Sequence, residues 1–409
     1  MPVRYTPPTA QSLLPVPGVL LGPAAGRIKK WDRNDVLLVA CEAGTVAAGV
    51  FTQNRFCAAP VIVCREHLTW QHANRGGMRA LIVNAGNANA GTGEAGLADA
   101  RAECVAVARL LGCAPEEVLV YSTGVIMEPL PVERIVDALP AAQSALRADH
   151  WFAAANAIMT TDTVPKGASR RVTVDGVPVM VTGIAKGAGM IHPNMATMLS
   201  FVTTDASVET SFLDAALRRV ADRTYNMVTV DGDTSCDDMV VLMANGAAGG
   251  EPINEGEGGD AFEAALFEVC RHLAREIARD GEGASKLIEV TVETAASDED
   301  ARRAALAVAG SMLLKSAVKG SDPNWGRIMN AVGYSGAEMV EESACVYIDD
   351  IMVYRDGLPI PFDAKAASAR MAQPEVRLRV TLGLGDGSAT GWGCDLTEEY
   401  VRINADYTT

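Results

Sequence analysis

Four short stretches of the chain combine glycine with hydroxyl or amide side chains. They are "NAGNANAGTG" (84–93), "YSTGVIMEPLP" (121–131), "MTTDTVPK" (159–166) and "KGAGMIHPNMATMLSFVTTD" (186–205). Each stretch alone is ordinary turn chemistry. Together they describe a site built from backbone N–H groups and small hydroxyls. Fixed donors of this kind suit the oxyanion of a tetrahedral intermediate in acyl transfer.

The stretch 186–205 also contains a candidate nucleophile. Thr197 follows Ala196 at the junction between a loop and the apolar run "MLSFVTT". If the chain were cut before Thr197, this threonine would carry a free α-amine, which can act as general base for its own hydroxyl. No histidine would then be needed. A threonine that begins a strand is also common for structural reasons, because β-branched side chains favour extended backbone. The residues alone leave both interpretations open.

Other chemistries have little support. The segment 231–242 begins like a calcium loop, but Cys236 occupies the sixth position, where such loops need glycine, and Leu242 the twelfth, where they need glutamate. The five histidines show no ligand spacing, and there is no phosphate-binding loop or dinucleotide-binding glycine pattern. We therefore expect neither a metal ion nor an organic cofactor.

Elements of two kinds must position these turns. Apolar residues at helical spacing predict helices over 96–112, 211–226, 260–280 and 298–318. Short β-rich runs lie between them, and Asp-Gly pairs at 175–176 and 356–357 predict hairpin turns, because these residues tolerate positive φ. Hairpins together with covering helices favour a layered α/β body of the α+β type, with antiparallel or mixed sheets, over a doubly wound parallel sheet.

Composition narrows the class of ligand. The 409 residues include 51 acidic and 35 basic side chains, which gives a formal charge of −16 and argues against nucleic acid or an anionic membrane as partner. No apolar run reaches the roughly 18 residues of a membrane span, and prolines interrupt the first residues where a signal peptide would be apolar. The nine cysteines form no CxxC pair, which is typical of reduced, buried thiols. We expect a cytoplasmic protein that binds small molecules.

Eight motifs in order give the chain a family resemblance. They are "NAGNANA", "STGVI", "TTDT", "GIAKGAGMIHPNMATML", "VDGDTS", "RDGEGASK", "DPNWGRI" and "YVRINADYTT". With these motifs the chain resembles the ornithine acetyltransferase family, also called glutamate N-acetyltransferase, over essentially its whole length. The resemblance implies a fold similar to N-terminal-nucleophile hydrolases with different connectivity. It also implies self-cleavage between Ala196 and Thr197 into an α chain, 1–196, and a β chain, 197–409, assembled as an α2β2 heterotetramer.

The resemblance also implies a reaction and its residues. Thr197 would take the acetyl group from N-acetylornithine and pass it to glutamate, in the arginine pathway and without a cofactor. The oxyanion hole would be formed by Thr123 and Gly124. The residues that match the family's substrate-binding positions are Thr160, Lys186, Thr197, Glu282, Asn404 and Thr409.

Two departures and three alternatives stay open. Met127 follows "STGVI" where glycine is expected, and would crowd the turn beside the oxyanion hole. Cys236 replaces an expected threonine, either as a core substitution or as a tuned thiol. The same fold could instead serve an amidohydrolase or aminopeptidase, which passes the acyl group to water, or an amino-acid-binding protein that never cleaves. Whether acetyl-CoA is a second acetyl donor cannot be read from the residues.

Overall fold

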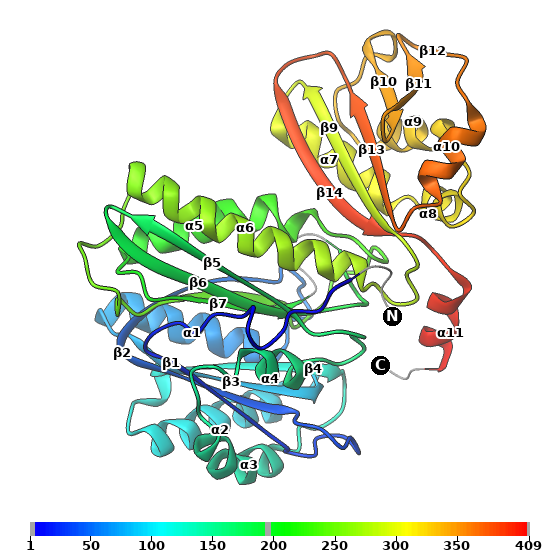
Figure 1. Cartoon of the computed structure of the whole chain (residues 1–409). Coiled ribbons are helices and arrows are strands. Elements are labelled where there is room, and N and C mark those ends of the chain that lie inside the picture. The colour runs from blue at the N-terminus through cyan, green and yellow to red at the C-terminus, as the bar shows by residue number, and fades with distance from the viewer. Residues whose placement is uncertain (1–4, 193–197, 407–409) are drawn as a thin grey trace.

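The computed structural model describes residues 5–192 and 198–406 and is shown in Figure 1. Ala196, Thr197 and Thr409 lie outside the described residues. The chain forms a larger body, which contains the first sheet, and a smaller body built on the second sheet. Among the described residues, no helix is both long and apolar enough to cross a membrane.

The first sheet is mixed, and a bent strand runs through it. Its order is β4 (Val118–Val125), β3 (Met78–Asn87), β2 (Val36–Phe51), β8 (Met239–Ala244), β7 (Leu199–Thr204), β6 (Val177–Lys186) and β5 (Lys166–Val174), with β1 (Val19–Ala24) also paired to β2. The register of β2 shifts between Ala40 and Thr45, so that its first half pairs with β3 and its second half with β8. The pairs β3–β4 and β7–β8 are parallel and the others are antiparallel.

Helices cover this sheet from both sides (Figure 1). Helices α5 (Thr210–Arg223) and α6 (Glu257–Arg279) lie over strands β5 and β6, and α2 (Gly93–Leu111) and α3 (Val132–Ser144) lie on the opposite side of the body. Helix α1 (Ala59–Asn74) packs against β4, and α4 (Trp151–Ala157) packs against β1 and β6. The apolar side chains that these layers bury exclude water from the strands that lead into the site.

The second sheet is also mixed. Its order is β12 (Leu358–Pro359), β11 (Ile351–Arg355), β10 (Cys345–Ile348), β13 (Glu375–Thr381), β9 (Leu287–Ala295) and β14 (Gly387–Cys394). Its helices are α7 (Asp298–Gly310), α8 (Met312–Lys319), α9 (Trp325–Tyr334) and α10 (Ala364–Met371). After β14, helix α11 (Glu398–Asp406) returns toward the larger body, where Asn404 contacts Glu282.

The predicted layered α/β organisation and both hairpin turns are confirmed. Asp175 and Gly176 have φ of 48° and 83° between β5 and β6, and Asp356 and Gly357 have φ of 51° and 75° between β11 and β12. The continuous helix expected over 298–318 is wrong, since it divides at Ser311 into α7 and α8. The backbone of Ser311 is extended, and its hydroxyl accepts a hydrogen bond from the N–H of Leu314, as an N-cap serine does.

All nine cysteines are free thiols, and six are buried, in agreement with the reduced state expected from the sequence. Cys236 is one of the buried six, and burial raises the pKa of its thiol to about 12. The thiol is therefore protonated at neutral pH. Of the two interpretations of Cys236, the structure favours the core substitution over a tuned thiolate.

Glu103 in helix α2 offers a test of stability against pH. Its side chain is fully buried, neither carboxylate oxygen has a hydrogen-bond partner among the described residues, and burial raises the pKa of Glu103 well above its ordinary value. The folded chain therefore keeps a proton that the unfolded chain releases above about pH 4.3, so this residue destabilises the fold increasingly as pH rises.

We expect Glu103→Met to increase the free energy of unfolding by about 1–3 kcal/mol at pH 8 and by less at pH 5. Urea denaturation at the two pH values measures both numbers. Glu94→Gln, at an exposed position of the same helix, is the control and should leave stability nearly unchanged at either pH. A gain for Glu103→Met that is equal at pH 5 and pH 8 would contradict the protonation argument.

Candidate active site

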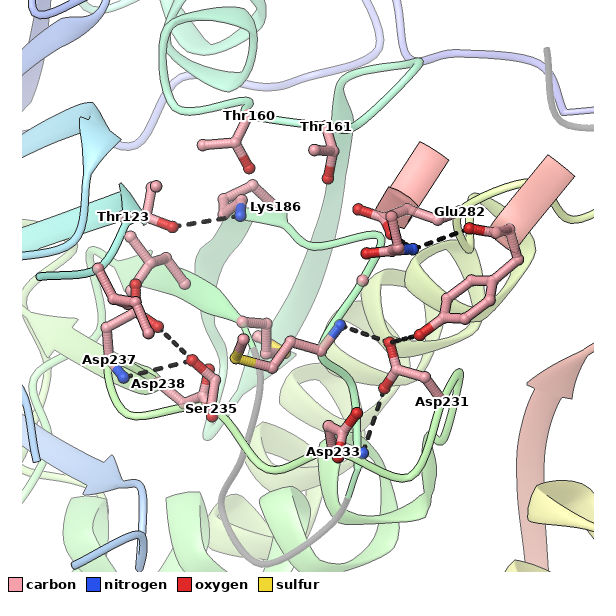
Figure 2. Close-up of a pocket in the computed structure, with 18 residues that line it drawn as sticks. Thr123, Thr160, Thr161, Lys186, Asp231, Asp233, Ser235, Asp237, Asp238 and Glu282 are labelled. Carbon is pink, nitrogen blue, oxygen red and sulfur yellow. Dashed lines mark hydrogen bonds between the residues drawn. The ribbon is translucent and has the colours of Figure 1, made fainter. Parts of the chain in front are cut away.

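One cavity of about 260 Å³ collects most of the residues expected at the site (Figure 2). The predicted site residues that line it are Thr123, Gly124, Thr160, Lys186, Glu282 and Asn404. They come from β4, the α4–β5 loop, β6, the loop after α6, and α11. Thr197 is not described, but Met198 and Leu199, which follow it directly, also line the cavity. The described residues that directly follow the candidate nucleophile therefore form part of this wall.

The turn at the end of β4 depends on a glycine. Gly124 has φ of 134°, and a Cβ at this position would lie 2.3 Å from the carbonyl carbon of Gly86 on the neighbouring strand β3. Only glycine fits both the conformation and the close approach. The "STG" and "NAG" motifs therefore meet, and their contact directs Thr123 into the cavity beside Gly124.

Lys186 and Thr123 form the polar end of the cavity. The Lys186 side chain is largely buried at the end of β6, and its ammonium donates a hydrogen bond of 3.2 Å to Thr123 Oγ1. A hydroxyl that accepts from a cation still has its own proton to donate, and the neighbouring positive charge polarises it. The Thr123 hydroxyl also hydrogen-bonds to the Asp237 carboxyl, and this contact opposes the rise that burial causes in the pKa of that group. If the hydroxyl turned from Asp237 toward the cavity, it could donate to a developing negative charge.

Carboxylates dominate the rest of the lining. Asp231, Asp233, Asp237, Asp238 and Glu282 all face the cavity, against the one lysine that lines it among the described residues. The cavity is consequently acidic and suits a ligand with an ammonium group.

Two of these carboxylates accept hydrogen bonds from the surrounding loops. Asp231 accepts hydrogen bonds from the N–H groups of Met190, at 2.6 Å, and Ile191, at 2.8 Å. Asp237 accepts one from the hydroxyl of Ser235. Burial raises the pKa of Asp231 and Asp237, although these hydrogen bonds oppose the shift. Within the described part of the chain, no group of three or more potential ligands is placed to hold a metal ion.

The C-terminal helix closes the opposite end. Asn404 Nδ2 donates to Glu282 Oε2 at 2.8 Å, and the Tyr400 hydroxyl contacts Asp231 at 3.3 Å. Figure 2 shows Thr123 and Lys186 on one side of the cavity and Glu282 on the other, with Thr160 above Lys186 and Thr161 between the two sides. The cavity can therefore hold an elongated ligand that carries different groups at its two ends.

Several residues that line the cavity have no role that the sequence predicts. The aspartates and serine of "VDGDTSCDD" resemble an incomplete calcium loop and include the family motif "VDGDTS", and Tyr400 belongs to the terminal motif, but neither pattern gives these residues a function. The available signal was the density of acidic and hydroxyl residues between two β-rich runs. That density does not say which face of the loop points inward, because this loop has no regular period.

Met127 does not crowd the cavity. Its side chain is 69% exposed, whereas the preceding Ile126 lines the cavity. The side chain therefore does not narrow the cavity, and the glycine expected at this position would suit the conformation of the backbone. Met127 has φ of 61°, in the left-handed region that costs a side-chain-bearing residue about 1–2 kcal/mol.

We expect Met127→Gly to increase the free energy of unfolding by about 0.5–1 kcal/mol, because the relief of strain exceeds the added freedom of the unfolded chain. Chemical denaturation measures this change. Arg75→Gly is the matched variant, since Arg75 also has a positive φ, 50°, and lies outside the cavity lining. A destabilised Met127→Gly alongside a stabilised Arg75→Gly would show that the Met127 side chain contributes packing.

Comparison with known proteins agrees with these motifs. The model of the ArgJ family matches residues 21–409. The arginine biosynthesis bifunctional protein ArgJ of Methylococcus capsulatus is 50% identical over 403 residues, which is 97% of each chain. The protein of the same name from Pseudomonas syringae pv. tomato is 48% identical over 402 residues, which is 97% of this chain and 98% of that one.

A solved structure is also similar. The crystal structure of the arginine biosynthesis bifunctional protein ArgJ from Bacillus halodurans is 46% identical to this chain, with a TM-score of 0.50. The match covers 98% of the crystal chain and 51% of this chain. With a family match from residue 21 to the last residue, and relatives near 50% identity over almost the whole length, this chain belongs to the ArgJ family.

Proposed function

We propose that this protein is a self-processing acetyltransferase of arginine biosynthesis, which moves the acetyl group of N-acetylornithine to glutamate through an acetyl-threonine intermediate. The observation that carries the proposal is the cavity itself. It brings hydroxyl, ammonium and carboxylate groups from five separate segments to the residues that directly follow Thr197. Family membership and the names of the relatives, which are arginine biosynthesis bifunctional proteins, supply the pathway.

The acyl end of the cavity supports the first half of the reaction. The Thr197 hydroxyl attacks the acetyl carbonyl and gives its proton to the free α-amine of the same residue. The Thr123 hydroxyl and the Gly124 N–H stabilise the resulting oxyanion, and Lys186 strengthens the Thr123 donor. The α-ammonium of Thr197 then returns this proton to the amide nitrogen as the C–N bond breaks, so that ornithine leaves with a free α-amine and the acetyl group stays on Thr197 as an ester.

The second half reverses these steps with glutamate. Its α-amine attacks the acetyl ester from the position that the ornithine α-amine has left, so both substrates use one subsite for the reacting nitrogen. The acidic lining near Glu282 and Asn404 favours the side-chain ammonium of ornithine. We assign Thr160 to the substrate as well, since it lines the same cavity.

The proposed division into residues 1–196 and 197–409 has one independent support. The Bacillus halodurans crystal chain matches over nearly its whole length, yet corresponds to only 51% of this chain. A polypeptide of about half length is what a cut before Thr197 would leave. The roles of Thr197 and Thr409, assembly as α2β2 and location in the cytoplasm stay predictions.

A transfer assay with three acceptor conditions tests the proposal. Purified protein is given N-acetylornithine with glutamate, with water alone, or with a different amino acid, and free ornithine and acetylglutamate are both measured. Ornithine release that depends on glutamate, with equal acetylglutamate formed, supports transfer. Ornithine release with acetate and no need for glutamate would instead identify an amidohydrolase, and no release would favour the amino-acid-binding alternative. Acetyl-CoA in place of N-acetylornithine shows whether a second donor is used.

A further inference from the structure

A buried charged triad lies behind the cavity wall. Lys166 begins strand β5 with a fully buried side chain, and its ammonium lies 2.6 Å from Asp162 Oδ1 and 2.7 Å from Asp280 Oδ2. The Asp162 side chain is also fully buried, and that of Asp280 is 2% exposed. None of the three residues lines the cavity. Charges removed from water are costly unless they are paired and hydrogen-bonded, so this arrangement calls for a specific reason.

Every carboxylate oxygen of the triad has a donor. Asp162 Oδ1 accepts from the N–H of Gly187 at 2.7 Å, in addition to Lys166, and Asp162 Oδ2 accepts from the N–H of Thr160 at 3.1 Å. Asp280 accepts from the N–H and the hydroxyl of Thr163. Because every carboxylate oxygen already accepts a hydrogen bond, neither aspartate is suited to take up a proton during catalysis. A network in which all groups are hydrogen-bonded instead fixes the positions of its members.

The pKa shifts of Asp162 and Lys166 agree with a network in which both of these groups are charged. Burial opposes the charge of Asp162, but the ammonium groups of Lys166 and Lys186 and the Gly187 N–H hold the pKa of this carboxyl below its ordinary value. The same pairing raises the pKa of Lys166 against the effect of burial. Asp162 and Lys166 therefore both carry their charges at neutral pH.

The segments that meet at the triad are those that carry the proposed substrate-binding residues. Asp162 holds Thr160 through its N–H and holds Gly187, the residue after Lys186. Asp280 stands two residues before Glu282, at the start of the loop that follows α6. One ammonium thus connects three walls of the cavity that are distant in the sequence.

We propose that Lys166, Asp162 and Asp280 are positioning residues, which hold Thr160, Lys186 and Glu282 in the geometry that acyl transfer needs. The proposal rests on the proposed function for the roles of those three side chains. The triad also crosses the proposed cut, because Asp162 and Lys166 belong to 1–196 and Asp280 to 197–409. The ion pair between Lys166 and Asp280 would therefore keep the two ends of the substrate site together after the chain is cut.

Two mild variants test the triad. Removal of Lys166 would leave two buried carboxylates unpaired and would endanger the fold. Thr163→Val instead removes one donor to Asp280, and Asp162→Asn keeps the shape of the side chain while an NH₂ replaces one acceptor. Leu217→Ala, which truncates a fully buried side chain of α5 away from the cavity lining, is the control for lost stability.

Each folded variant should change the kinetic constant that depends on the part of the cavity it disturbs. Thr163→Val should raise the KM for N-acetylornithine roughly three- to tenfold, the effect of one hydrogen bond, with kcat nearly unchanged. Asp162→Asn should lower kcat by roughly 10²-fold, because misplacement of the Lys186 segment disturbs the oxyanion end. Leu217→Ala should alter neither constant, although its thermal midpoint falls.

Hydrogen exchange measured by mass spectrometry gives a reading that does not depend on activity. Asp162→Asn should speed amide exchange at Gly187, and Thr163→Val should speed it over residues 281–284, beyond any change in Leu217→Ala. Exchange and kinetic constants that move no more than in Leu217→Ala would overturn the proposal. If the wild-type protein transfers no acetyl group, the proposed function fails, and exchange alone then decides whether the triad holds these segments.

Discussion

Thr197→Ala should yield a single uncut chain of 43.0 kDa that folds normally and transfers no acetyl group. Without the hydroxyl, neither the acyl shift that cuts the backbone nor attack on the acetyl carbonyl can begin. Met198 and Leu199, which directly follow Thr197 in the sequence, line the cavity that holds the groups proposed to act on this carbonyl. Mass spectrometry under denaturing conditions and the transfer assay measure the two losses separately.

Thr197→Ser is the matched control, because it keeps a hydroxyl and an α-amine after cutting. We expect this variant to be cut and to turn over more slowly than the wild type. The wild type should give two fragments, one that ends at Ala196 and one whose sequence begins with threonine, methionine, leucine and serine. A Thr197→Ala protein that is still cut there, or that retains transfer, would place the nucleophile elsewhere.

Thr123→Val should lower kcat by roughly 10²–10³-fold with little effect on KM, because it removes one donor to the oxyanion and keeps the shape of the side chain. The structure makes this donor unusual, since the Lys186 ammonium already contacts its oxygen at 3.2 Å. The rate should be expressed per cut molecule, with the cut fraction taken from the intact mass, so that slower processing is not mistaken for slower transfer.

Thr203→Val is the control for this substitution. Thr203 is a fully buried threonine of β7 that is not part of the cavity lining, and its hydroxyl has no hydrogen-bond partner among the described residues. The same chemical change there should leave kcat within about twofold of the wild type, since no donor is lost. A Thr123→Val enzyme with wild-type kcat would remove this hydroxyl from the oxyanion site.

The sequence predicts local features of the fold better than its long-range arrangement. The Asp-Gly turns at 175–176 and 356–357 are recognisable because two adjacent residues determine the backbone there. The break at Ser311 is missed because its neighbours keep an apolar helical spacing on both sides, and one hydroxyl that caps α8 outweighs that pattern. The bend in β2, which joins the two halves of the first sheet, contains Gly44 with φ of 87°. One glycine inside a strand indicates a bulge, but it does not say which strands pair on either side of it.

The site, like the fold, contains residues that local motifs predict and residues that only the tertiary structure brings together. Family motifs identify Thr123, Lys186 and Glu282, and the structure brings these residues to one cavity. The roles of the buried residues behind them could not be predicted, because Asp162 and Asp280 are 118 positions apart in the chain and only the tertiary fold joins them through one lysine. The sequence shows that residues 231–238 are rich in aspartate, but it does not show that these side chains line one cavity.

The strand order of the first sheet constrains when the chain can be cut. Strands β7 and β8 belong to 197–409, yet they lie between β2 and β6, which belong to 1–196. A sheet interleaved in this way forms most readily while covalent continuity keeps all the strands within reach of one another. Maturation would therefore have to follow completion of the sheet. If the cut protein unfolds, its two polypeptides would have to associate again before the first sheet could re-form.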